Sequence, residues 1–71
     1  MYTGHYIDGD HIYGPQTRGR YYIANKYIYG PRGGGRFYID SGYIYGPKQS
    51  GRYYVSEGHI YGPSKDLPFI A

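Results

Sequence analysis

The tetrapeptide Ile-Tyr-Gly-Pro occurs four times in this chain, and its copies are spaced by 16 residues without a slip. A second element keeps the same period and reads Arg, two aromatic residues and an aliphatic residue. A fixed period means that one small structural unit is repeated and packed against its neighbours. The tetrapeptides begin at Ile12, Ile28, Ile44 and Ile60, and the second element begins at Arg20, Arg36 and Arg52.

The repeat predicts a single β-hairpin repeat domain over residues 1–71, without a linker. We place the units at about 4–19, 20–35, 36–51 and 52–67, followed by a half unit at 68–71. The first unit carries an altered second element, Gly4-His5-Tyr6-Ile7. The half unit reads Pro68-Phe69-Ile70-Ala71, and we expect it to fill a sheet edge, either within the chain or by exchange between copies.

The residues of each unit are typical of β-strands. Tyr, Ile, Phe and Val fill the periodic segments, and Gly-Pro ends each of them, since proline has no N–H to donate inside a sheet. In the second unit we predict strands at 20–24 and 27–30, joined by Asn25-Lys26. The equivalent pairs at 9–10, 41–42 and 57–58 contain Gly, as a two-residue hairpin turn with positive φ requires.

This register sorts the side chains onto two faces, because neighbouring residues of a strand point to opposite sides. One face carries the cross-strand pairs Ile7/Ile12, Ile23/Ile28, Ile39/Ile44 and Val55/Ile60, flanked by Tyr21, Phe37 and Tyr53. This face must be covered, since burial of an aliphatic side chain is worth ~1.5–3 kcal/mol. The opposite face carries Tyr6, Tyr13, Tyr22, Tyr29, Tyr38, Tyr45, Tyr54 and Tyr61.

The predicted fold is therefore an all-β antiparallel meander, and three architectures cover its aliphatic face. The meander can curl into a small barrel, whose interior at about eight strands is just wide enough for side chains to fill. The hairpins can also stack as a solenoid, or an open sheet can pair face to face with a second copy. The sequence leaves these three open.

Charge is sorted by position along the units, within a formal net charge of +3. The acidic residues Asp8, Asp10, Asp40 and Glu57 lie at the short turns, where Lys26 is the one basic residue. We expect an acidic rim and a basic rim, which keep the protein soluble or let the arginines and the Gly33-Gly34-Gly35 run hold an anion. The basic rim comprises Arg18, Arg20, Arg32, Arg36, Lys48, Arg52 and Lys65, together with one acid, Asp66.

Several kinds of chemistry find little support in the sequence. The chain has no Cys, and its serines lack a neighbouring His and Asp to activate them, so we predict no enzyme, no catalytic residue and no cofactor. Asp8, Asp10 and His11 can be interpreted as metal ligands or as a polar turn; we favour the turn and predict no metal site. No apolar run is long enough for a transmembrane helix, and we see no signal peptide, so cytoplasmic localisation is the default expectation.

Three stretches of the chain resemble the hairpin of choline- and glucan-binding cell-wall repeats. These stretches carry a basic residue, an aromatic pair, an aliphatic residue and a polar turn, as in Gly51-Arg52-Tyr53-Tyr54-Val55-Ser56-Glu57-Gly58. The other two begin at Gly19 and Gly35. The resemblance implies hairpins stacked in a solenoid, with choline or glucan bound between units. It also implies that Tyr21, Phe37 and Tyr53 occupy the place of a Trp in the family's ligand cage, although this chain has no Trp.

The tyrosine face is the best functional lead in the sequence. Tyrosine rings stack on sugars, nucleobases and other proteins, and they attract cations. We predict a non-enzymatic module that binds a glycan or a protein through the eight tyrosines, aided by Arg20, Arg36 and Arg52. The alternatives are a self-associating dimer that pairs through its aliphatic face or sheet edge, and, less favoured by the low net charge, a module for single-stranded nucleic acid or another anion. A purely structural role of the tyrosines, as cross-strand pairs, also remains open.

Overall fold

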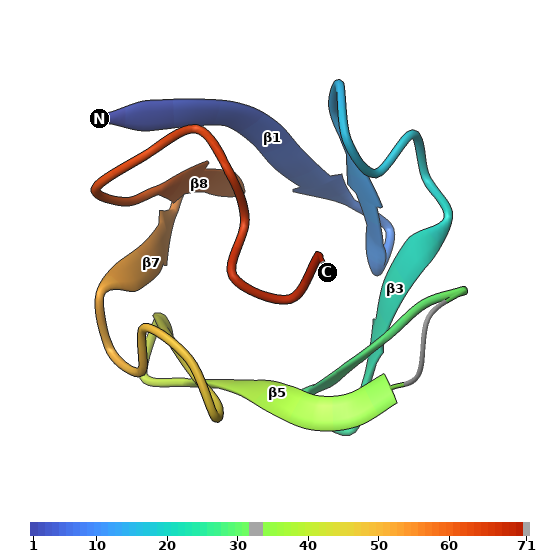
Figure 1. The fold of residues 1–71 in the computed structure, drawn as a ribbon. Coiled ribbons are helices and arrows are strands. Elements are labelled where there is room, and N and C mark those ends of the chain that lie inside the picture. The colour runs from blue at the N-terminus through green and yellow to red at the C-terminus, as the bar shows by residue number, and fades with distance from the viewer. Residues whose placement is uncertain (32–33, 71) are drawn as a thin grey trace.

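Eight antiparallel strands follow one another along the chain and close into a barrel, seen along its axis in Figure 1. This computed structural model describes residues 1–31 and 34–70. The strands are β1 (Tyr2–Asp8), β2 (His11–Tyr13), β3 (Tyr21–Ala24), β4 (Tyr27–Tyr29), β5 (Gly34–Asp40), β6 (Tyr43–Tyr45), β7 (Tyr53–Ser56) and β8 (His59–Tyr61).

The predicted two-residue turns are confirmed in all four hairpins. Both residues of each turn have positive φ, which is the backbone of a type I′ turn and matches the twist of the flanking strands. The second turn position holds Gly42 and Gly58 in the later hairpins, but Asp10 and Lys26 in the earlier ones, each of these two with φ 74°. Side chains at such φ are strained, so the first two turns are suboptimal.

The strain at Lys26 yields a stability prediction. Lys26→Gly creates the Asn-Gly sequence preferred in type I′ turns and should raise the free energy of unfolding by about 1 kcal/mol. Lys26 also lies 3.8 Å from Asp40, but both side chains are well exposed and the loss of this ion pair costs little. Thermal denaturation checks the result, with Lys26→Ala as the control that removes the charge and keeps the strain. Equal melting temperatures for the two variants would contradict this explanation.

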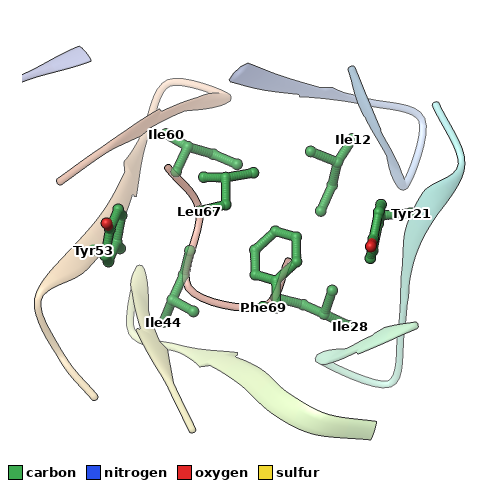
Figure 2. Packing of buried hydrophobic residues seen from close by; sticks show 8 residues of the cluster. All are labelled: Ile12, Tyr21, Ile28, Ile44, Tyr53, Ile60, Leu67 and Phe69. Atoms are coloured by element: carbon green, nitrogen blue, oxygen red, sulfur yellow. The ribbon is translucent and has the colours of Figure 1, made fainter. Parts of the chain in front are cut away.

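The register of the hairpins is also as predicted, and it places the aliphatic face inside. Ile7 pairs with Ile12, Ile23 with Ile28, Ile39 with Ile44, and Val55 with Ile60. Figure 2 shows the second member of each pair pointing into the barrel, together with the rings of Tyr21, Tyr53 and Phe69. The buried core consists of Ile12, Tyr21, Ile28, Ile44, Tyr53, Ile60, Leu67 and Phe69.

Pairing of β1 with β8 closes the sheet and selects the barrel among the three predicted architectures. The same kind of backbone hydrogen bond joins β1 to the β8 hairpin and joins neighbouring units elsewhere in the barrel. Ile7 N–H donates to the Gly58 carbonyl at 2.7 Å, and the equivalent bond between earlier units runs from Ile23 N–H to the Asp10 carbonyl at 2.8 Å. The sheet therefore has no unpaired edge within the described residues, and its aliphatic face is internal. Neither surface of the predicted dimer is available in this fold.

The C-terminal segment differs from the prediction. It forms no strand within the described residues and fills no sheet edge. Instead, residues 63–70 turn inward across one end of the barrel, and the last of them lie near its axis (Figure 1). Leu67 and Phe69 are buried there, and Phe69 packs on the rings of Tyr21 and Phe37. We call residues 63–70 the plug; Ala71 of the predicted half unit lies outside the described residues.

Candidate aromatic binding surface

The eight predicted tyrosines lie on the outer wall of the barrel, where they form four cross-strand stacks. The paired rings are Tyr6/Tyr13, Tyr22/Tyr29, Tyr38/Tyr45 and Tyr54/Tyr61, with centroids 5.3–5.6 Å apart and interplanar angles of 13–27°. Offset stacks of this kind stabilise a sheet by about 0.5–1.5 kcal/mol each. The eight tyrosines therefore have the structural role that the sequence left open, and only the ring surface outside the stacks is free to bind a ligand.

The two rings of a stack are not equally free. Tyr6, Tyr22, Tyr38 and Tyr54 are 39–43% exposed, whereas their partners are half-buried. Three of the partner rings, Tyr13, Tyr29 and Tyr45, lie against a glycine that follows their strand: a Cβ on Gly19 would meet the Tyr13 ring at 2.8 Å, and one on Gly51 the Tyr45 ring at 3.4 Å. The half-buried ring is thus a fixed support, and the exposed ring above it is a platform.

A second set of rings, which was not predicted to belong to the site, lies beside the platforms. His11, Tyr27, Tyr43 and His59 occupy one repeated position, directly before the Ile of each tetrapeptide. Each lies across a strand boundary from a platform, at 5.9–6.3 Å between centroids and 44–55° between ring planes. We call each such pair an aromatic corner. The four corners are His11/Tyr22, Tyr27/Tyr38, Tyr43/Tyr54 and His59/Tyr6.

The corners belong to an aromatic belt that extends around the barrel wall. The ring of Tyr2, at the start of β1, packs against the rings of Tyr61 and His59, with 5.4 Å between centroids in both cases, and thereby links neighbouring units. Tyr2, Tyr27 and Tyr43 are 43–46% exposed, like the platforms. The signal for the missed rings was present in the sequence as the repeated position that His11, Tyr27, Tyr43 and His59 share. Alternation places that position on the outer face.

The predicted arginines lie close to the belt in sequence, but two of them are engaged by their own connections. Arg20 Nε donates to the Thr17 carbonyl at 3.4 Å, and Arg52 Nη1 donates to Gln49 Oε1 at 3.2 Å. Arg36 lies in β5 two residues before Tyr38, so alternation places both on the outer face. Arg36 is thus the predicted arginine best placed to contact a ligand at a platform.

The predicted charge separation follows from the topology. In an up-and-down barrel the short hairpin turns lie at one end and the long connections at the other, so the acids and bases named above lie at opposite ends. At the basic end, a groove of about 410 Å³ separates the connection bearing Lys48 and Arg52 from the plug, with Leu67 and Pro68 also lining it. Arg32 and Gly33, part of the predicted basic rim and anion loop, lie outside the described residues.

The first hairpin turn carries the residues that the sequence offered as metal ligands or as a polar turn. Asp8 faces His11 across the first hairpin, and His11 Nδ1 lies 3.0 Å from the Gly19 carbonyl. Over residues 1–31 and 34–70 no three His, Cys, Asp or Glu side chains gather in a way that would hold a metal ion. The same residues contain no helix long and apolar enough to cross a bilayer.

The ligand cage implied by the resemblance to cell-wall repeats can be compared with the positions of its three rings. The rings that it places in a ligand cage, Tyr21, Phe37 and Tyr53, point into the barrel, and Tyr21 and Tyr53 are buried. A surface cage built from these three rings is therefore not present. No family model, curated protein or solved structure matches this chain.

Proposed function

We propose that this protein is a non-enzymatic carbohydrate-binding module, and that its binding sites are the aromatic corners. The observation that carries the proposal is the repeated pairing of an exposed platform tyrosine with a second ring inclined to it by 44–55°. A flat platform suits the apolar face of a pyranose, the inclined ring limits its orientation, and the phenol hydroxyls provide hydrogen-bond partners at the rim.

The support beneath each platform favours binding over mere exposure. Because Tyr38 is stacked on Tyr45, and Tyr45 rests against Gly51, the Tyr38 ring loses little conformational freedom when a ligand covers it. Preorganised rings of this kind lower the entropic cost of binding. The corners repeat around the barrel, so a polymer with repeating sugars gains avidity when it contacts more than one of them.

The corners differ in chemistry, and this difference ranks them. Tyr27/Tyr38 and Tyr43/Tyr54 offer two phenol rings, while the other two corners pair one phenol with an imidazole. We expect the two Tyr/Tyr corners to be the stronger sites. In the same region Arg36 stands on the outer face of β5, which also carries Tyr38.

The test is a titration followed by NMR of the tyrosine ring signals, with chitotetraose, cellotetraose and xylotetraose as probes. Tyr27→Ala removes the inclined ring and leaves the Tyr38/Tyr45 stack in place, so binding at that corner should weaken about tenfold, or about 1.4 kcal/mol. Tyr2→Ala is the matched control, because Tyr2 is equally exposed and belongs to neither Tyr/Tyr corner.

Three results would contradict the proposal. The rings at both Tyr/Tyr corners would be unaffected by every saccharide, or Tyr27→Ala and Tyr2→Ala would weaken binding equally. Alternatively, a single-stranded oligonucleotide would bind instead, with affinity falling steeply as salt increases, which is the signature of phosphate contacts. That last outcome would assign the belt to base stacking.

A further inference from the structure

A buried histidine occupies a place that a large ring occupies in the other three units. The 16-residue period aligns His5 with Tyr21, Phe37 and Tyr53. Like them, it points inward opposite a tetrapeptide glycine: a Cβ on Gly14 would meet the His5 ring at 2.4 Å. His5 is 0% exposed, so its imidazole is held within the barrel.

Hydrogen bonds fix which nitrogen of His5 carries the proton. The backbone N–H of Gln16 donates to Nε2 at 3.2 Å, so Nε2 is an acceptor and the proton is on Nδ1. Nδ1 lies 3.3 Å from Thr3 Oγ1, which accepts its proton and donates its own to the Ile60 carbonyl at 2.8 Å. Each nitrogen of the neutral imidazole thus has a hydrogen-bond partner, and a second proton on Nε2 would face the Gln16 N–H.

The residue that holds Nε2 also holds the plug. The Gln16 side-chain amide donates to Asp66 Oδ1 at 3.1 Å, and its Oε1 accepts from the Leu67 backbone N–H at 3.1 Å. Gln16 therefore joins His5, through its backbone, to the plug, through its side chain. Other attachments of the plug are the Tyr53 hydroxyl, which donates to the Asp66 carbonyl at 2.5 Å, and the burial of Leu67 and Phe69.

We propose that protonation of His5 displaces Gln16 and releases the plug from the end of the barrel, which makes this segment an acid-operated closure. A proton on Nε2 would place two N–H donors against each other at the Gln16 contact. Both Gln16 bonds to the plug depend on the position of this residue. Release would uncover the apolar interior at the basic end and widen the groove that the plug lines there.

The charged groups around His5 do not neutralise an imidazolium. On the adjacent strands, His11 and His59 are exposed on the outer wall. In the connection after β2, Arg18 and Arg20 are exposed, and the N-terminal ammonium donates to the Gly62 carbonyl. Among the carboxylates of residues 1–31 and 34–70, Asp66 is the one that side-chain hydrogen bonds link to His5, and the link runs through Gln16.

The direction of the pH effect follows from burial. Burial lowers the pKa of His5 below its usual 6.5, although a hydrogen bond with the Thr3 backbone opposes this in part. In the released form the imidazole is nearer to water, so its pKa returns toward 6.5 and this form binds the proton more tightly. Plug release is therefore favoured as pH falls below 6.5, whereas above 6.5 the closed form is unaffected by pH through this group.

The test follows two signals in the wild-type protein by NMR between pH 7.5 and 5: the His5 imidazole carbons and amide hydrogen exchange at Leu67. Exchange at Leu67, corrected for intrinsic pH dependence, should increase by at least about threefold with the midpoint of the His5 titration. Exchange at Ile28 and Ile44 should stay constant over the same range, since the barrel remains folded. Uniform loss of protection at all three residues would overturn the proposal, because it would mean global acid unfolding.

Two variants separate the latch from the general effect of acid. Gln16→Ala keeps the backbone bond to His5 but removes both bonds to the plug, so Leu67 should exchange rapidly at every pH while the barrel amides stay protected. His5→Gln removes the titrating group and should abolish the pH dependence, whereas His11→Gln and His59→Gln should retain it. Persistence of the acid transition in His5→Gln would refute the proposal, and if that variant does not fold, the wild-type and Gln16→Ala experiments still decide it.

Discussion

Gly30→Ala is expected to lower the free energy of unfolding by about 3 kcal/mol, which is the upper range for overpacking a well-filled core. A Cβ at this position would lie 2.2 Å from the ring of Tyr21, far inside van der Waals contact. Tyr21 cannot move away easily, because it is buried and packs on Phe69 at 5.5 Å. Chemical denaturation measures the loss, and the melting temperature should fall by at least about 12 °C in a domain of this size.

A double-mutant cycle tests whether the ring is the cause. Tyr21→Leu leaves room beside residue 30, so Gly30→Ala should cost much less in that background than in the wild type. Gly9→Ala is the matched control for a change of Gly to Ala elsewhere: it has no neighbour within 4 Å, and only its φ of 55° opposes a side chain. Additive losses for Gly30→Ala and Tyr21→Leu would show that the close approach is not what requires glycine.

The glycine of each Ile-Tyr-Gly-Pro tetrapeptide illustrates how far the sequence predicts this fold. The two-residue turns determine the register of each hairpin, and the same register, extended by one residue, places Tyr21 opposite Gly30, Phe37 opposite Gly46 and Tyr53 opposite Gly62. This pairing was available from the sequence, where the glycine was interpreted only as the end of a strand. Local rules were sufficient because each hairpin contact lies within one unit.

Closure of the barrel was not predictable in the same way. Whether eight short strands curl into a barrel depends on strand tilt and stagger, which accumulate over the whole sheet and have no signature in any single unit. The pairing of Tyr2 with Tyr61 and of Tyr6 with His59 joins the two ends of the chain, so the repeat period does not encode it. For this reason a barrel, a solenoid and a paired sheet remained equal alternatives.

The binding surface was predicted in part. The outer position of the eight tyrosines follows from alternation, but the corners arise between units, as where Tyr27 of β4 pairs with Tyr38 of β5. The plug was missed for a related reason. Its last described residues, Pro68-Phe69-Ile70, resemble half a unit, yet the space that the plug fills exists only once the barrel has closed.

Phe69→Ala is expected to cost about 3 kcal/mol or more, as large-to-small substitutions of buried aromatic residues do. Phe69 is 9% exposed, and its ring packs between Tyr21 at 5.5 Å and Phe37 at 6.1 Å. Around Phe69 the interior is lined by Tyr21 and by isoleucines from all four units (Figure 2). A domain of this length has only about 4–10 kcal/mol of stability in total, so this loss is a large share of it, although the barrel should remain folded at 25 °C.

Phe69→Leu and Lys65→Ala are the two controls for Phe69→Ala. Leu retains most of the buried volume and should cost less than half as much, while Lys65 is exposed and its replacement should change the free energy of unfolding by less than about 0.5 kcal/mol. If Phe69→Ala were as mild as Lys65→Ala, the plug would be an appendage and the barrel would be stable without it. A large loss would establish instead that the buried ring of Phe69 contributes a substantial share of the stability of the closed barrel.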